Sequence, residues 1–262
     1  MATRKNTPLT IIAIIVFAFL ILPLVIITIT AFGGENTIVF PIKSFSLKWF
    51  ANVFNSETFV TSFLLSLKLA LLATVLALLV GIPAAYALAR HWEKGNTFLK
   101  SFFLSPTLVP GIVLGFALFQ FLIIILQIPL FIGLLLGHFL TVLPYIIRIV
   151  GASMEQVDIS IEEVAWSLGC TKPKAFFKVV LPNISSGITS AFMLAFINSF
   201  NNIPVSMFLT GPGVSTLPTT LMNYIEYYYD PTVSAVSVIL MLATIAIMYL
   251  VEKTLGIGAL LG

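Results

Sequence analysis

Charged side chains are scarce in this sequence. Asp, Glu, Lys and Arg make up 9% of its 262 residues, whereas an ordinary soluble domain carries about 25%. Apolar and aromatic residues make up 59%, and no soluble fold of this size has enough interior to bury so much apolar surface. These proportions exclude a water-soluble enzyme, a nucleic-acid-binding protein and a disordered chain. They predict an all-α membrane protein with several spans.

The residues of common catalytic and metal sites are also missing. The single cysteine, Cys170, excludes an intrachain disulfide framework and a cysteine-based zinc site, and it is interpreted as a small packing residue. The sequence contains no G-x-x-x-x-G-K-[ST] phosphate-binding loop, no H-E-x-x-H and no G-x-S-x-G. His91 and His138 are far apart in sequence and have no evident acidic partner in a span. We therefore expect neither an enzyme nor a chain that binds a cofactor or a metal by itself.

Six membrane spans are predicted from the intervals that lack charges. A spanning helix needs about 20 mostly apolar residues, and the intervals that provide them are 6–34, 69–89, 101–147, 182–203 and 231–251. The third interval is long enough for two spans, with the natural break at 127–129. The first could be a cleaved signal peptide, but its apolar run exceeds the usual length of about 7–15 residues and no A-x-A site follows it. It is therefore interpreted as a retained helix.

The distribution of positive charges predicts the orientation of these spans. With both termini in the cytoplasm, ten Lys and Arg residues fall on the cytoplasmic side and three on the outer side. The ten are Arg4, Lys5, Arg90, Lys94, Lys100, Arg148, Lys172, Lys174, Lys178 and Lys253, and the three are Lys43, Lys48 and Lys68. This asymmetry satisfies the positive-inside rule, and the opposite orientation would violate it.

Two longer segments are expected on the outer side, at 33–59 and 204–232. In the first, the aromatic residues Phe45, Trp49, Phe50 and Phe54 indicate a short amphipathic helix at the membrane interface. The second contains four tyrosines between positions 224 and 229. Such a group is typical of anchoring at a membrane surface.

The cytoplasmic segment 149–181 carries the most specific pattern in the chain. Ser160 followed three residues later by Glu163 predicts a capping box at a helix start, and Gly169 predicts its left-handed end. Pro173 suits the first turn of a second short helix. The apolar positions of the two helices are Ile161, Val164, Ala165 and Leu168 in the first and Phe176, Phe177 and Val180 in the second. Such a compact helix–turn–helix could be a folded connector, or it could be a docking element for a cytoplasmic partner.

The same segment resembles a known family. Glu163-x-Ala165-x-x-x-Gly169, nine further residues, and then Val179-x-Leu181-Pro182 is similar to the signature loop of bacterial ABC-importer permeases. The spacing agrees throughout, and Val164 and Val179 are conservative departures from Ala and Ile. The resemblance to the five-span permease core covers about residues 60–256. In the chain, this core would follow a variable first span with an external segment, residues 1–59. A short tail, residues 257–262, would come after it.

The resemblance implies a fold, partners and a mechanism. The fold would be that of a type I ABC importer permease, with six transmembrane helices and a cytoplasmic coupling helix, in the bacterial inner membrane. A second permease would complete the pathway, an extracytoplasmic binding protein would deliver the solute, and a cytoplasmic ATPase dimer would bind ATP and Mg²⁺. The loop would insert into that ATPase. Its expected contact residues are Glu162, Glu163, Ala165, Ser167, Gly169 and Pro173.

A narrower resemblance concerns the solute. Residues 199–225 are similar to the segment after the fifth span in permeases of the spermidine/putrescine type, although Asn201 and Asn202 stand where members often carry an acidic pair. We expect a small polar solute, polyamine-like or otherwise amine-bearing. The polar cluster at span depth that could contact it contains Asn198, Ser199, Asn201 and Asn202, and Pro204 could break the helix beyond it. These amides could instead form hydrogen bonds between helices.

Two other kinds of membrane protein remain as alternatives. A secondary transporter would need carboxylates for its coupling ion inside the spans, and all ten acidic residues fall in loops or at span edges. A channel subunit would need no docking element.

Overall fold

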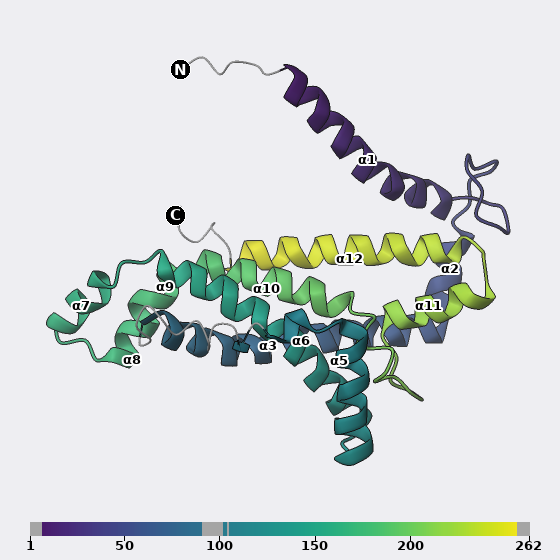
Figure 1. The fold of residues 1–262 in the computed structure, drawn as a ribbon. Helices are drawn as coiled ribbons and strands as arrows, with labels where there is room; N and C mark the ends of the chain where they lie inside the picture. The colour runs from purple at the N-terminus through teal and green to yellow at the C-terminus, as the bar shows by residue number, and fades with distance from the viewer. Residues whose placement is uncertain (1–6, 91–101, 104, 256–262) are drawn as a thin grey trace. The chain divides into compact units, whose positions relative to one another are not determined.

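The computed structural model describes residues 7–90, 102–103 and 105–255, and nearly all of its regular structure is helical (Figure 1). The long helices are α1 (Thr7–Ala31), α3 (Glu57–Arg90), α6 (Leu130–Glu155), α10 (Ser185–Phe200) and α12 (Thr232–Leu255). The shorter ones are α2 (Lys48–Asn55), η1 (Ser105–Leu108), α5 (Gly111–Leu118), η2 (Phe119–Ile125), α7 (Ser160–Ser167), α8 (Lys172–Ala175), η3 (Phe176–Val180), α9 (Leu181–Asn183) and α11 (Leu217–Tyr227). The predicted all-α class is therefore confirmed for the described residues.

The predicted number of six spans is not reproduced in full. Within the described residues, four helices are long and apolar enough to cross a membrane, namely Pro8–Ala31, Glu57–Arg90, Leu130–Glu155 and Thr232–Thr254. A fifth candidate is α10 together with the helices before it, and these are bent by 72°. The remaining predicted span corresponds to the shorter apolar helix Gly111–Ile125. The bend follows Pro182, whose missing backbone N–H cannot continue a regular helix.

The chain forms two compact units, which are described separately. Unit 1 comprises Met1–Val60 and Leu221–Ala243, and unit 2 comprises Thr61–Thr220 and Thr244–Gly262. The predicted division at residues 59/60 and 256/257 stays a prediction. The tail at 257–262 lies outside the described residues, as do His91 and the basic residues Arg4, Lys5, Lys94 and Lys100.

Unit 1 contains the expected amphipathic helix. In α2, Val53 is buried and Phe54 is exposed. Phe45 lies before this helix, and its ring stacks on Phe32 with 5.4 Å between centroids. The Trp49 indole donates a hydrogen bond to the Gly33 carbonyl at 2.9 Å. The most apolar window of α1 has no residue buried within the protein, which suits a helix surrounded by lipid.

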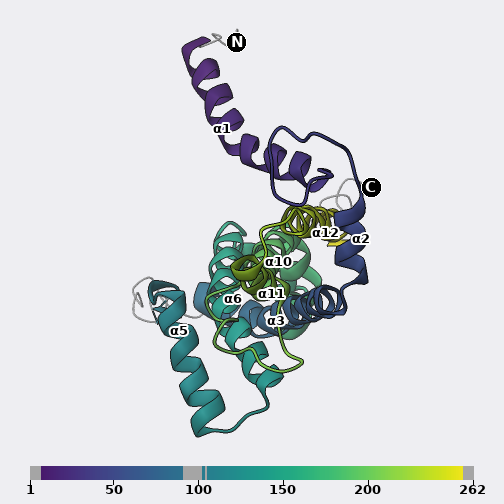
Figure 2. The same ribbon diagram turned by 90° about the vertical axis from the view of Figure 1, so that its right-hand side faces the viewer.

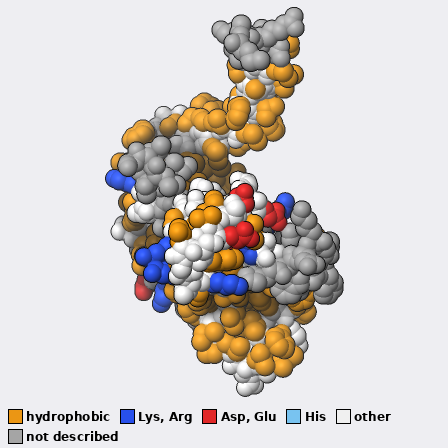
Figure 3. Space-filling model, turned by 90° about the vertical axis from the view of Figure 1, so that its left-hand side faces the viewer, with side chains coloured by type: hydrophobic (Ala, Val, Ile, Leu, Met, Phe, Trp, Pro, Cys, Tyr) orange, Lys and Arg blue, Asp and Glu red, His pale blue; other side chains and the backbone are white. Residues whose placement is uncertain are grey.

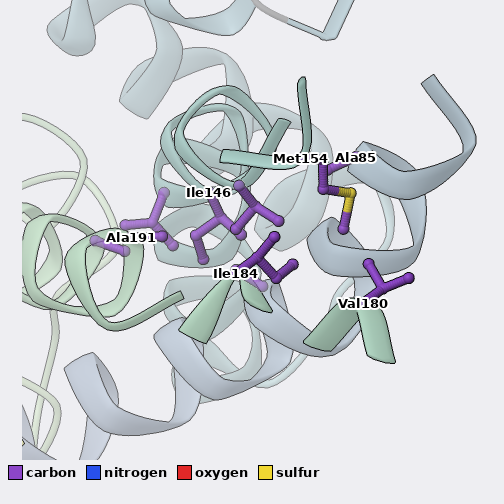
Figure 4. Close-up of a cluster of buried hydrophobic side chains, with 10 residues drawn as sticks. Ala85, Ile146, Met154, Val180, Ile184 and Ala191 are labelled. Carbon is purple, nitrogen blue, oxygen red and sulfur yellow. The ribbon is translucent and has the colours of Figure 1, made fainter. Parts of the chain in front are cut away.

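The core of unit 2 lies between α3, α6, α10 and the π-helix η3. Buried side chains from these elements meet there (Figure 4): Ala77, Ala85, Val142, Ile146, Val150, Met154, Val180, Ile184, Ala191 and Ala195. Figures 1 and 2 show α6 and α10 running beside each other. A small residue also allows α3 to approach α6 closely, because a Cβ on Gly81 in α3 would lie 2.7 Å from the Ile146 side chain in α6.

A second cluster fixes the segment that follows α10. Val205 and Leu209 are buried against Leu118, Leu122 and Leu134. A Cβ on Gly115 would lie 2.6 Å from the carbonyl oxygen of Pro204, so α5 contacts this backbone directly. The chain after Phe200 is therefore packed against other parts of unit 2, although it is not helical.

Candidate functional site

The cytoplasmic segment forms the predicted pair of short helices, but its first helix begins differently from the expectation. Helix α7 has no side-chain cap from Ser160, which is its first helical residue, so the predicted capping box with Glu163 is wrong. The Asp158 carboxylate instead accepts a hydrogen bond from the Ser160 backbone N–H at 2.9 Å. This bond lowers the pKa of Asp158. An aspartate two residues earlier supplies the acceptor that the capping box would have supplied.

The end of α7 agrees with the prediction for Gly169. Its φ is +83°, in the left-handed region. The Gly169 N–H donates to the Trp166 carbonyl at 2.9 Å, and the Cys170 N–H donates to the Ala165 carbonyl at 3.0 Å. This pair of bonds is the Schellman motif. Pro173 lies in the first turn of α8, as predicted. We call residues 160–183 the α7–α9 hairpin.

The hairpin exposes apolar side chains. Leu168 is 83% exposed and Phe177 is 66% exposed. Ile159, Ile161 and Val164 are also exposed, so the predicted apolar stripe of α7 largely faces outward instead of packing on the protein. Lys172, Lys174 and Lys178 are exposed as well. Acidic and basic side chains gather beside apolar ones on this face (Figure 3).

The two adjacent glutamates of α7 have opposite environments. Glu163 is exposed, whereas Glu162 is 1% exposed. A Glu162 oxygen lies 2.7 Å from Nε of Arg90, at the end of α3. The other oxygen accepts a hydrogen bond from the Tyr86 hydroxyl at 2.8 Å. No sequence pattern indicates a role for Tyr86, and Arg90 is expected from the sequence only as a cytoplasmic charge. Their one sequence signal is their i, i+4 spacing at the end of a span.

The other predicted contact residues of the hairpin lie at or near its surface. Ser167, Gly169 and Pro173 are exposed, and Ala165 is half-buried. The Ser167 hydroxyl donates to the Glu163 carbonyl at 2.9 Å, which keeps it on its own helix. A Cβ on Gly169 would meet no atom within 4 Å in the described part of the chain, its two neighbours apart. Of the six predicted contact residues, Glu162 is therefore the one whose side chain is turned fully inward.

A polar cavity of about 200 Å³ lies in unit 2 at the end of α10. Its lining consists of Val109, Gly111, Leu114, Thr141, Tyr145, Asn198 and Asn202. Helix α10 ends at Phe200, and the Asn202 side-chain oxygen accepts a hydrogen bond from the Val205 N–H at 3.0 Å. All the lining residues are uncharged, so the cavity offers amide, hydroxyl and phenol groups to a solute.

The structure divides the predicted polar cluster. Asn198 and Asn202 line the cavity. Asn201 is exposed, and its amide donates to the Ile197 carbonyl of its own helix at 3.2 Å. Ser199 is buried, and its hydroxyl lies 2.8 Å from Nδ1 of His138.

His138 is a residue for which the sequence indicated no role. It is fully buried in α6. Its second ring nitrogen lies 2.9 Å from the hydroxyl of Ser206, which in turn donates to the Asn202 carbonyl at 2.6 Å. The imidazole therefore links the end of α10 to the segment that follows it. The serines are 61 and 68 residues from His138 in sequence, so no local pattern reveals them.

Comparison with known proteins identifies the family of this chain and several relatives. The family model described as "Binding-protein-dependent transport system inner membrane component" matches residues 77–255. The putrescine transport system permease protein PotI of Escherichia coli K12 is 26% identical over 232 residues, which are 86% of this chain and 82% of that protein. The spermidine/putrescine transport system permease protein PotC of the same strain is 27% identical over 236 residues, which are 89% of this chain and 88% of that protein.

A solved structure has a similar fold. It is a chain of a bacterial ABC transporter involved in the import of the acidic polysaccharide alginate, and it matches with a TM-score of 0.69 at 17% identity. The match covers 97% of this chain and 99% of that chain. The likeness shows the type I importer permease fold that the signature loop implied, and it carries no information about the solute.

Proposed function

Since the chain belongs to the family of binding-protein-dependent transport system inner membrane components and is an ABC importer permease, we propose that it forms a solute pathway together with a second permease. A cytoplasmic ATPase dimer drives this pathway, and an extracytoplasmic binding protein supplies it. The α7–α9 hairpin and both termini lie on the cytoplasmic side. The basic residues of the hairpin and Arg90 beside it support this orientation.

The observation that carries this proposal is the exposed apolar surface of the hairpin. Leaving a large aliphatic side chain in water forgoes about 1.5–3 kcal/mol that its burial would contribute. Leu168, Val164 and Phe177 expose more than half of their surface. The hairpin lies where Arg90 ends a span, so lipid is an unsuitable cover for it. A groove of the ATPase subunit covers these side chains in the proposed complex.

The alternatives are less well supported. Within the described spans α3, α6 and α12, the acidic residues are Glu57, Glu155 and Glu252, and each lies in a terminal turn. A secondary transporter that couples to an ion through a mid-span carboxylate finds no such group there. The function of a channel subunit would not explain a rigid protrusion that exposes apolar side chains.

The proposed solute is a small amine-bearing compound of the putrescine or spermidine kind. The names of the two polyamine permeases support this choice. The cavity adds that amide oxygens and the Tyr145 phenol can accept hydrogen bonds from ammonium groups. Neutral acceptors bind a cation without the strong attraction of a buried carboxylate, which suits a pathway that must release its cargo.

The docking proposal is tested by Leu168→Asp. The complex is assembled in proteoliposomes with the cognate second permease, ATPase and binding protein. We expect loss of ATPase co-purification and of labelled putrescine or spermidine uptake, because a charge replaces the most exposed apolar contact. The matched control is Thr254→Asp, which adds the same charge at the exposed end of α12. Unchanged co-purification of Leu168→Asp would contradict the proposal.

The cavity is tested separately by single substitutions of its amides. Asn198→Ala and Asn202→Ala should raise the KM for uptake while the complex still assembles. Asn201→Ala removes an amide of the same helix end that does not line the cavity, so its kinetics should stay within about twofold of the wild type. Equal effects of all three would mean that the amides act through packing.

A further inference from the structure

Arg90 connects three segments at the cytoplasmic end of unit 2. Its Nε lies 2.7 Å from the Glu162 carboxylate in α7. Its Nη2 donates a hydrogen bond to the Val157 carbonyl at 2.9 Å, just beyond the end of α6. One guanidinium therefore holds the end of α3, the chain after α6 and the first helix of the hairpin in a fixed relation.

Tyr86, one turn earlier in α3, contacts both arms of the hairpin. Its hydroxyl donates to the other Glu162 oxygen. Its ring lies edge-on to the Phe176 ring, with 4.9 Å between centroids. We call Tyr86, Arg90, Val157, Glu162 and Phe176 the α3 anchor. Through it, both the outgoing helix α7 and the returning helix η3 contact the same end of one span.

The charged side chains of the anchor are almost completely buried. The side chains of Arg90 and Glu162 are 9% and 1% exposed. A pair of charges removed from water is poorly replaced by either charge alone, because the remaining one is then buried without compensation. The pair therefore favours a single arrangement of the hairpin against α3. An exposed ion pair would restrict it little.

The hairpin needs such an attachment, because its first helix is short. Helix α7 has eight residues, and isolated helices below about 12–15 residues are marginal in water. Ile161 and Val164 are exposed, and of the apolar side chains of α7 only Ala165 and Trp166 are half-buried, so few of them hold it to the protein. The inward contacts of Glu162 therefore determine much of the position of α7.

We propose that Arg90 and Glu162 are a positioning pair that transmits displacement of the hairpin into α3. This inference rests on the proposed function, in which the ATPase moves the hairpin. Leu168 and Val164 contact the partner on the outer face of α7, and Glu162 is tied to α3 on its inner face. With the pair intact, the hairpin and the end of α3 move as one body. Without it, α7 reorients locally and the span stays behind.

The proposal predicts loss of coupling with docking retained. Glu162→Gln keeps the side-chain shape and removes its charge. We expect solute imported per ATP hydrolysed to fall about tenfold, within the range by which single residues of a coupled network change coupling, while ATPase co-purification stays near wild type. Arg90→Lys keeps the positive charge near Glu162, but an ammonium group lacks the planar guanidinium geometry that contacts both Glu162 and the Val157 carbonyl. Its defect should therefore be smaller than that of Glu162→Gln. The control is Glu252→Gln, at an exposed position in α12, and it should change neither quantity.

A direct measure of the attachment uses Cys170, the single cysteine of the chain, which follows Gly169 in the hairpin turn. A spin label placed there before assembly with cysteine-free partners reports how firmly the hairpin is held. Glu162→Gln should increase the mobility of this label in the isolated permease, and Arg90→Lys should increase it less. This readout needs neither solute nor ATPase.

The outcomes separate this inference from the proposed function. Unchanged label mobility and unchanged import per ATP in Glu162→Gln would overturn the positioning role. Loss of ATPase co-purification in Glu162→Gln would also overturn it, because the glutamate would then act in docking. If the wild-type complex neither retains an ATPase nor imports putrescine or spermidine, the proposed function fails. A label mobility that still depends on Glu162 would then show the attachment without its coupling role.

Discussion

Gly187 in α10 packs directly against Ser153 in α6. A Cβ added to Gly187 would collide with the Ser153 hydroxyl and lie 2.5 Å from its Cβ. The Ser153 hydroxyl meanwhile donates to the Ile149 carbonyl within α6 at 3.1 Å. The two helices therefore touch at backbone distance, and this contact places α10 beside the core of unit 2.

We predict that Gly187→Ala destabilises the protein by about 1–3 kcal/mol, as overpacking of a tight contact usually does. The matched control is Gly151→Ala in α6, where an added Cβ meets no atom of the described residues within 4 Å, its chain neighbours and own helix backbone apart. That change should be neutral or stabilise by about 0.4–1 kcal/mol, because alanine restricts the unfolded chain. Thermal unfolding of the purified protein in detergent measures both. Equal shifts for the two variants would contradict a tight α6–α10 contact.

A second prediction concerns the buried imidazole. His138→Ala leaves the Ser199 hydroxyl without its partner and removes one of the contacts of Ser206. We expect a loss of about 1–3 kcal/mol, the usual cost of a buried polar group without a partner. Ser199→Ala should cost less, and the double variant should show a coupling energy of about 0.5–3 kcal/mol. Strict additivity in thermal unfolding would mean that the two groups do not interact.

His138 also affects the cavity through the chain after α10. Ser206 contacts both the imidazole and the Asn202 carbonyl, and Asn202 lines the cavity. His138→Ala should therefore raise the KM for uptake in the same direction as Asn202→Ala. An unchanged KM with lowered stability would limit His138 to a structural role.

The start of α7 gives a pH-dependent prediction. The hydrogen bond from the Ser160 N–H lowers the pKa of Asp158 in the folded protein. A lowered pKa means that the ionised form stabilises the fold; its contribution is present at neutral pH and is lost as the pH falls through the lowered value. Asp158→Ala should lower the protection of amides in the first turn of α7 against hydrogen exchange at neutral pH. Acidification should then cause no further loss of protection at that site in this variant. Asp158→Asn retains an acceptor and should exchange more slowly than Asp158→Ala.

Sequence patterns were informative where the physics is local. Hydrophobic composition identified the membrane class, because the burial capacity of a soluble fold is limited. The left-handed end of α7 followed from Gly169, since a Schellman turn needs a positive φ that glycine adopts without strain. The proline at the start of α8 was equally predictable. These features depend on a few adjacent residues.

The patterns failed where distant residues decide. Glu162 faces inward because Arg90 and Tyr86 neutralise and solvate it, and they are 72 and 76 residues away. Without that knowledge, the spacing of Ile161, Val164 and Leu168 indicated the packed face of α7, and these side chains are exposed. The capping box failed for a local reason, since Asp158 competed with Ser160 for the same helix start.

The polar cluster in the outer part of the fifth predicted span is divided by tertiary contacts. Sequence placed four polar residues within five positions, but a helix end cannot direct them all to one side. Asn198 and Asn202 face the cavity, Ser199 faces His138, and Asn201 is exposed. The bend before α10 follows Pro182, and a hydrophobicity pattern alone gives no sign of it.

The last prediction separates strain from bulk at Gly169. Its φ of +83° strains a residue with a Cβ, by about 1–2 kcal/mol for most types, whereas asparagine tolerates this conformation well. Among the described residues, apart from its two chain neighbours, none has an atom within 4 Å of an added Cβ, so we expect a side chain there to meet a partner. If the turn matters through its conformation, Gly169→Asn should retain ATPase co-purification and uptake, and Gly169→Val should lose most of both while still reaching the membrane. If close approach of the ATPase matters, both variants should lose docking. Wild-type docking and uptake in Gly169→Val would reduce the hairpin to a connector and remove the main support for the proposed importer mechanism.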